Sequence, residues 1–244
     1  MKGCVYMAFT VRWLGQGGFL FNLGGHILAI DPYLSDSVQD SSDHFRRMAP
    51  PPVQPDMLGA EVIICTHDHL DHLDPDTLSR TAAEVYAGPP SCLEHYEALG
   101  LRKEKLTRIG RGDIYHLGKA RIMGVPANHT EDSIGVVIEF GGVKIYVTGD
   151  TLQDGALADI GCMGIDILLT CINGKLGNMN AIEAAALAKA LPCKLAIPMH
   201  YGMFAENTVD PNDFSAAMLE SGIPVAELSI GKTVDIYDLM KLTV

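Results

Sequence analysis

The chain has 244 residues, of which 48% are hydrophobic and 20% charged, and its formal net charge is −12. This composition argues against global disorder and predicts one sizeable core, with a single domain over residues 1–244. The acidic balance disfavours nucleic acid as a partner, because such binding depends on neutralising phosphates. We expect no membrane segment, since no apolar run approaches the roughly 18 residues of a spanning helix.

The six cysteines form no C-x-x-C pair and stand mostly in apolar runs. They are Cys4, Cys65, Cys92, Cys162, Cys171 and Cys193. This pattern predicts buried, reduced thiols and a reducing compartment. The N-terminus lacks the pattern of a signal peptide, so we expect a cytoplasmic protein.

The first third of the chain predicts strands and one long loop. Residues 9–21 and 26–31 are rich in strand formers. The glycines of residues 15–18 do not fit G-x-G-x-x-G, so we expect a tight turn or close backbone approach there. Residues 36–56 are polar and then proline-rich, which predicts a long loop that is either a lid or an ordinary surface loop.

Strand and helix signals then alternate. We expect strands over residues 62–66 and 85–87. A helix should begin at Asp74 and Pro75, with Leu78 and Ala82 on its apolar face, because Asp suits the cap and Pro the first turn. A short helix over residues 91–99 should end at Gly100.

Residues 106–146 predict several short strands, with a hairpin at Gly141-Gly142. Further strands are expected at residues 165–170 and 195–198, and helices at residues 181–191 and 211–221. The order indicates an α/β (α+β) fold with a mixed sheet. Two sheets covered by outer helices would bury these apolar runs.

The strongest functional signal is the run His67-Asp68-His69-Leu70-Asp71-His72, directly after a buried strand. Such a density of imidazole and carboxylate groups is typical of a site for zinc, manganese or iron. Adjacent Asp71 and His72 point in different directions from the first two histidines. That arrangement fits two metal ions better than one.

Three further candidates follow other predicted strands: His129, Asp150 and His200. Each alone would be an ordinary turn or structural residue, but together they supply the ligands that a two-metal site still needs. Asp150 can bridge two ions with its two oxygens. The remaining histidines, His26, His44, His95 and His116, lack such a context.

In this order, His67-x-His69-x-Asp71-His72, His129, Asp150 and His200, the sequence resembles the metallo-β-lactamase superfamily of metal-dependent hydrolases. The resemblance implies a four-layer αββα sandwich with the site at one edge. It implies that one metal is held by His67, His69 and His129, and the second by Asp71, His72 and His200. Asp150 would bridge the two.

A narrower resemblance, to the branch of the L-ascorbate-6-phosphate lactonases, is carried by residues 171–180, 183–185 and 197–203, with Trp13-Leu14-Gly15 and Ile30-Asp31-Pro32. It suggests that Asn173, Lys175 and Asn178 bind substrate. The other interpretation is a glycine-rich loop held by its own amide bonds. The branch often has arginine where this chain has Lys175, which leaves the substrate open.

We therefore expect an enzyme with two divalent ions (Zn, Mn or Fe), in which a hydroxide held by the metals opens a small anionic lactone or ester, such as a sugar lactone phosphate. Asp71 would orient the water or carry its proton, or act only as a ligand. Two alternatives are a phosphodiesterase acting on a small cyclic or lipid-type diester and a non-catalytic metal-binding regulatory protein. A homo-oligomer is consistent with the resemblance.

Overall fold

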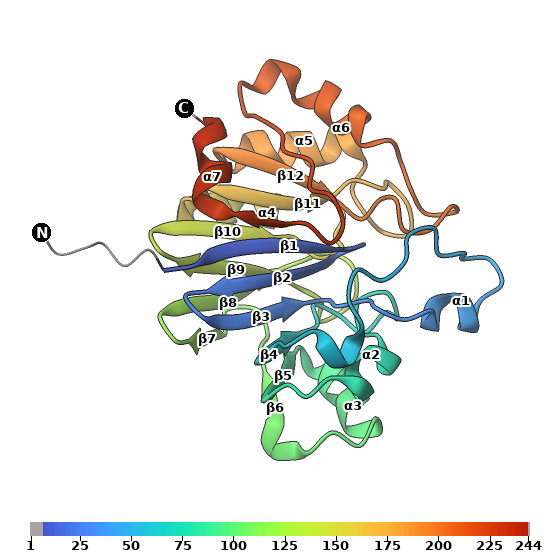
Figure 1. Ribbon diagram of the computed structural model, residues 1–244. Helices are drawn as coiled ribbons and strands as arrows, with labels where there is room; N and C mark the ends of the chain where they lie inside the picture. Colours follow the sequence, from blue (N-terminus) through green and yellow to red (C-terminus); the bar gives the residue numbers. More distant parts are fainter. Residues whose placement is uncertain (1–6, 244) are drawn as a thin grey trace, which may run out of the picture.

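The strands form two sheets that pack against each other, with helices on the outside (Figure 1). A computed structural model describes residues 7–243, so Cys4 lies outside the described residues. The first sheet has the order β13-β1-β2-β3-β4-β5-β6 and the second the order β12-β11-β10-β9-β8-β7. Both sheets contribute to one large apolar core. The expected αββα sandwich is confirmed.

The strands of the first sheet are β1 (Phe9–Gly15), β2 (Gly18–Leu23), β3 (His26–Ile30), β4 (Val62–Ile64), β5 (Val85–Gly88), β6 (Leu106–Arg108) and β13 (Thr233–Asp235). Those of the second are β7 (Ile114–Leu117), β8 (Ala120–Pro126), β9 (Ile134–Phe140), β10 (Val143–Val147), β11 (Ile167–Cys171) and β12 (Leu195–Met199). The helices are α1 (Ser37–Ser41), α2 (Pro75–Arg80), α3 (Pro90–Ala98), α4 (Gly155–Asp159), α5 (Ala181–Ala190), α6 (Pro211–Met218) and α7 (Ile236–Met240).

The parallel strands of the two sheets put the site at the carboxyl ends of those strands. Strands β3, β4 and β5 run parallel, as do β10, β11 and β12. Strands β4, β11 and β12 are buried along their whole length, as continuous apolar runs predict for a sheet covered on both faces. The loops that leave their carboxyl ends therefore gather together.

Several boundaries differ from the sequence prediction. Helix α2 ends at Arg80, so Ala82 lies beyond it and packs no helical face. The expected loop over residues 36–56 contains α1 and the start of a 3-10 turn (Pro55–Met57). The sequence analysis also missed β13, which pairs with β1, and α7.

The described cysteines are unpaired. Four of them are buried as predicted, but Cys162 is exposed, which corrects the expectation of uniform burial. Within residues 7–243 no helix has the length and apolar character needed to cross a membrane.

Asp74 fixes the start of α2 against the segment that follows β3. This buried carboxylate caps α2 by accepting from the backbone N–H of Asp76. It also accepts from the backbone N–H groups of Leu34 and Ser35 and from the hydroxyls of Ser35 and Thr77. One side chain thus joins the approach to α1 to the helix that follows the histidine motif.

Replacing Asp74 by alanine should lower the free energy of unfolding by at least about 2 kcal/mol, because several buried donors lose their acceptor. Asp76→Ala is the matched control, since Asp76 is exposed in the same helical turn. Urea unfolding measures both variants. Equal losses would show that Asp74 acts only as an ordinary surface cap.

Candidate metal centre

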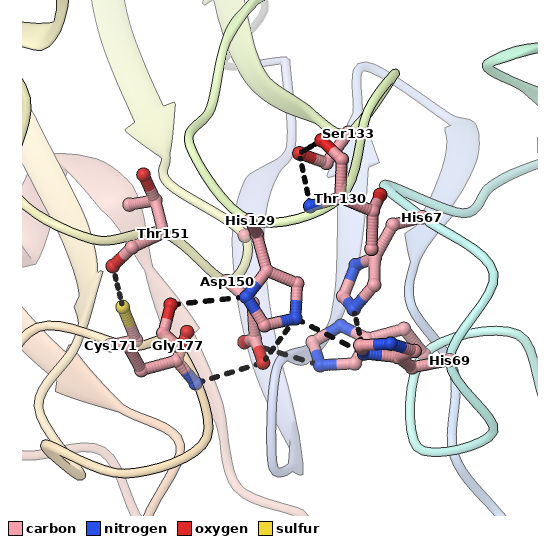
Figure 2. Close-up of polar contacts among 12 residues, drawn as sticks. His67, His69, His129, Thr130, Ser133, Asp150, Thr151, Cys171 and Gly177 are labelled. Atoms are coloured by element: carbon pink, nitrogen blue, oxygen red, sulfur yellow. Dashed lines mark hydrogen bonds and ion pairs between the residues drawn. The ribbon is translucent and has the colours of Figure 1, made fainter.

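The seven residues predicted as ligands meet where the two sheets come together. His67, His69, Asp71 and His72 lie on the loop between β4 and α2. The other three follow strands of the second sheet, with His129 after β8, Asp150 after β10 and His200 after β12. Figure 2 shows His67, His69 and His129 converging beside Asp150. The structure therefore brings the whole predicted set together.

The ligand atoms are close enough to share metal ions. His69 Nδ1 lies 3.1 Å from His67 Nε2 and 3.1 Å from His129 Nε2. Three groups each offer one ligand atom per residue within 4.8 Å: His67 with His69 and His129, His67 with His72 and Asp150, and Asp71 with His72 and His200. Nitrogens bound to one zinc ion at about 2.0–2.1 Å in a tetrahedron would lie roughly 3.3 Å apart. The spacing fits this geometry.

Hydrogen bonds on the outer side of two rings direct the inner nitrogens to the centre. His129 Nδ1–H donates to the carbonyl of Gly177 (3.0 Å). Thr66 gives its hydroxyl proton to Asp31, so it accepts from His67 Nδ1–H (3.1 Å). The Nε2 atoms of both rings are left to face the cluster. Asp150 Oδ1 is buried and makes no well-aligned hydrogen bond, although His72 Nε2 and His200 Nε2 lie 3.2 and 3.1 Å away. An unsatisfied carboxylate oxygen among ring nitrogens is the environment a cation completes.

The electrostatics separate the two sides of the cluster. Burial lowers the pKa values of His67 and His129, so these rings are neutral. Burial also acts to lower the pKa values of His72 and His200, but the carboxylates beside them outweigh it, with Asp150 the largest contributor. The pKa of His200 is raised to about 9. In turn, His200 and His72 hold the pKa of Asp150 well below its usual value despite its burial.

Asp31, to which the sequence assigned no role in the site, contacts a predicted ligand. It is fully buried at the end of β3, and its backbone has φ 45°. Its Oδ2 accepts from His72 Nδ1–H at 2.7 Å, and the carboxylate also accepts from the backbone N–H and hydroxyl of Thr66. A carboxylate behind a ligating histidine fixes the ring and strengthens its basicity. The signal available in the sequence was an aspartate directly after an apolar strand.

Gln16 is a second residue that contacts the predicted ligands and was given no site role from the sequence. It stands in the turn between β1 and β2 with φ 51°, and its side chain is fully buried. Its Nε2 donates to Asp71 Oδ2 at 2.8 Å and lies 3.0 Å from His200 Nε2. The next residue must be glycine, because a Cβ on Gly17 would lie 2.7 Å from the His72 ring. The close backbone approach expected for residues 15–18 is thus an approach to the metal ligands.

The three predicted substrate residues lie in different places. Asn178 donates through Nδ2 to Asp150 Oδ2 at 2.8 Å, so it positions a predicted ligand. Asn173 donates to Asn207 Oδ1 and to the carbonyl of Lys175. The Lys175 ammonium donates to the carbonyl of Glu206, on a surface hollow separate from the cluster. Substrate contact by these residues stays a prediction.

Two histidines set aside in the sequence analysis have local partners. His26 lies 3.0 Å from Glu61, and His95 lies 3.5 Å from Asp68. Asp68 belongs to the histidine motif but is in none of the three ligand groups. It is therefore a useful control within that motif.

The variant Asp31→Asn should weaken metal binding by about 10–100-fold, because His72 loses the carboxylate that orients it. Asp68→Asn should bind metal like the wild type. Competition with a chromophoric chelator measures both. Wild-type affinity in Asp31→Asn would remove Asp31 from the metal centre.

Metal binding should release protons at pH 7.5, since His72 and His200 are protonated before their nitrogens can ligate. The apparent metal affinity of the group formed by Asp71, His72 and His200 should therefore fall as the pH is lowered. A pH indicator in weakly buffered solution follows the release during metal addition. His200→Ala should reduce it and His116→Ala, on the exposed strand β7, should not; equal release from both variants would be evidence against this assignment.

Comparison with known proteins identifies the family of the chain. A family model described as a beta-lactamase superfamily domain matches residues 10–200. A UPF0173 metal-dependent hydrolase from Sulfurisphaera tokodaii is 31% identical over 242 residues, covering 93% of this chain and 99% of the relative. A second, from Opitutus terrae, is 29% identical over 93% of this chain and 99% of its own.

Among solved structures, Igni18, a metallo hydrolase from the archaeon Ignicoccus hospitalis, shares the fold with a TM-score of 0.72. It is 24% identical, and the match covers 93% of this chain and 97% of that one. The structural likeness by itself shows the fold, and the sequence matches show the family. The chain thus belongs to the UPF0173 metal-dependent hydrolases of the metallo-β-lactamase superfamily.

Proposed function

We propose that this hydrolase opens the carbonyl carbon–oxygen bond of a small lactone or ester. The supporting observation is a cavity of about 490 Å³ that has His69, Asp71, His129 and Asp150 in its wall. This volume suits a small molecule. None of the described residues that line it is Lys or Arg. A phosphodiester would find no side-chain cation here, whereas a carbonyl needs none.

We propose two divalent ions in the cluster, one on His67, His69 and His129 and one on Asp71, His72 and His200, with Asp150 between them. Zinc, manganese and iron all suit these nitrogen and oxygen ligands. Such ions supply a water whose pKa is near ~7 and positive charge beside the carbonyl oxygen.

Asp71 is the residue we propose for proton handling at the site. Burial acts to raise its pKa, but His72 and His200 outweigh burial and hold the pKa below its usual range. Asp71 is therefore a carboxylate, and Gln16 fixes its Oδ2 by a 2.8 Å hydrogen bond. A fixed carboxylate in the cavity wall can orient the attacking water and accept its proton. Pure ligation is the other role it can have.

The remaining partner expectations stay predictions. The cavity size supports a small-molecule substrate, and the formal net charge of −12 disfavours nucleic acid. A homo-oligomer and a cytoplasmic location rest on the sequence arguments alone.

Side-by-side initial rates on manganese-reconstituted protein test the chemistry. One substrate is a simple lactone and the other an activated phosphodiester. We expect faster lactone opening that a chelator abolishes. Diester cleavage without lactone opening would replace the proposal by phosphodiesterase activity. No turnover of either substrate would favour the non-catalytic metal-binding alternative.

Asp71→Asn should lower the turnover rate by at least about 100-fold, because an amide cannot accept the proton. Metal content, measured by elemental analysis, must be determined alongside the rate to separate proton handling from ligation. Asp68→Asn, three positions away in the same motif, should keep its activity. Near wild-type turnover in Asp71→Asn would assign it no catalytic role.

A further inference from the structure

The cavity above the metal centre has an apolar side that the proposed chemistry does not use. Its full lining is Val38, Ser41, Ser42, Phe45, His69, Leu70, Asp71, His129, Asp150, Leu176, Phe204 and Asn207. The metal ligands occupy one part of the wall. The rest comes mainly from α1 and the segment after it, from the loop before α5 and from the loop after β12.

The apolar wall is built around Phe204. This ring is buried and lies 5.6 Å from the Tyr33 ring and 5.8 Å from the Phe45 ring, between centroids. Val38 and Phe45 pack against the same small core. Aromatic pairs at such distances stabilise each other beyond the area that they bury. The apolar wall is thus held by packing within the chain itself.

Two leucines extend this surface to the solvent. Leu70 is 37% exposed and Leu176 is 65% exposed, and both line the cavity. Leu70 stands within the histidine motif, next to two predicted ligands. Exposed apolar side chains that adjoin an apolar cavity mark a binding site more often than isolated ones do.

No Lys or Arg side chain is among the described residues that line the cavity. Of the two arginines that follow Phe45, Arg46 is exposed and does not line the cavity. The Arg47 guanidinium donates to the carbonyls of Tyr33, Ser35 and Ala49 and lies over the Tyr33 ring. Lys175 donates to the carbonyl of Glu206 and lines another hollow. A phosphate in this cavity would meet the neutral hydroxyl and amide groups of Ser41, Ser42 and Asn207 but no side-chain cation to offset its lost hydration.

The charges around the ions also leave little attraction for a second anionic group. Two divalent ions would bring four positive charges, and the carboxylates of Asp71, Asp150 and Asp31 would return three negative ones. The chain as a whole carries −12, and a field of that sign opposes anions. An anionic group on the substrate would find its attraction only at the ions themselves.

We propose that the part of the substrate remote from the reacting carbonyl is an uncharged alkyl chain, which binds along Val38, Phe45, Phe204, Leu70 and Leu176. This inference rests on the proposed function for the position of the carbonyl and adds the substrate class. A medium-chain lactone or ester fits this arrangement, and a phosphorylated sugar lactone does not. The apolar wall selects the substrate by chain length.

Binding can be tested without turnover. Straight-chain carboxylates from acetate to octanoate, titrated calorimetrically into manganese-reconstituted protein, place one anionic end on the ions. We expect affinity to rise about fourfold for each methylene that enters the cavity. The heat-capacity change should become more negative with chain length.

Three variants assign the effect to the wall. Phe45→Ala should lower the affinity for octanoate by about tenfold or more and leave acetate unchanged. Leu219→Ala is the matched control, because Leu219 is 82% exposed and lies outside the cavity. Val38→Lys adds an ammonium group to the wall and should weaken octanoate while strengthening phosphate. It also replaces Phe45→Ala if that variant does not fold.

Affinity that stays flat along the series would overturn the inference. A kinetic arm compares γ-butyrolactone with γ-octalactone and keeps the two proposals distinct. If affinity rises with chain length but neither lactone is opened, the proposed reaction fails and the apolar subsite stands. If both are opened with the same kcat/KM, the reaction stands and the alkyl subsite fails.

Discussion

The carboxylate of Asp31 is the constraint on which the site depends. It holds the end of β3 to the end of β4 through both donors of Thr66, and it fixes the ring of His72. The same Thr66 hydroxyl sets the orientation of His67. One buried group therefore aligns two rings that belong to different predicted metal sites. Its unusual φ of 45° marks a backbone conformation kept for that purpose.

The sequence predicted the elements that carry strong local signals. Apolar runs located the buried strands β4, β11 and β12, and Asp74 and Pro75 marked the start of α2. The seven ligand candidates were found because the dense run of histidine and aspartate in residues 67–72 is rare outside metal sites and because His129, Asp150 and His200 follow other predicted strands. These residues converge because the strands that precede them end at the same edge of the sandwich. The fold class predicted from the sequence implies this arrangement.

What the sequence did not predict depends on contacts distant along the chain. Strand β13 forms only because β1 offers a partner more than 200 positions away. From the sequence, Gln16 is an ordinary turn residue, but in the structure its side-chain amide donates to Asp71. Asn178 was predicted to bind substrate, and in the structure it donates to Asp150. The cavity wall joins segments whose composition alone indicates a polar loop. Long-range packing, rather than local propensity, decides these features.

The ligands come from both sheets, with four on the loop after β4 and three after strands of the second sheet. Metal ions held by this set would form a reversible cross-link between the two sheets of the sandwich. Part of the metal-binding free energy would then be free energy of folding. A substitution deep between the sheets would shift the spacing of the ring nitrogens without touching them. Metal affinity would therefore report on how well the two layers of this protein are packed.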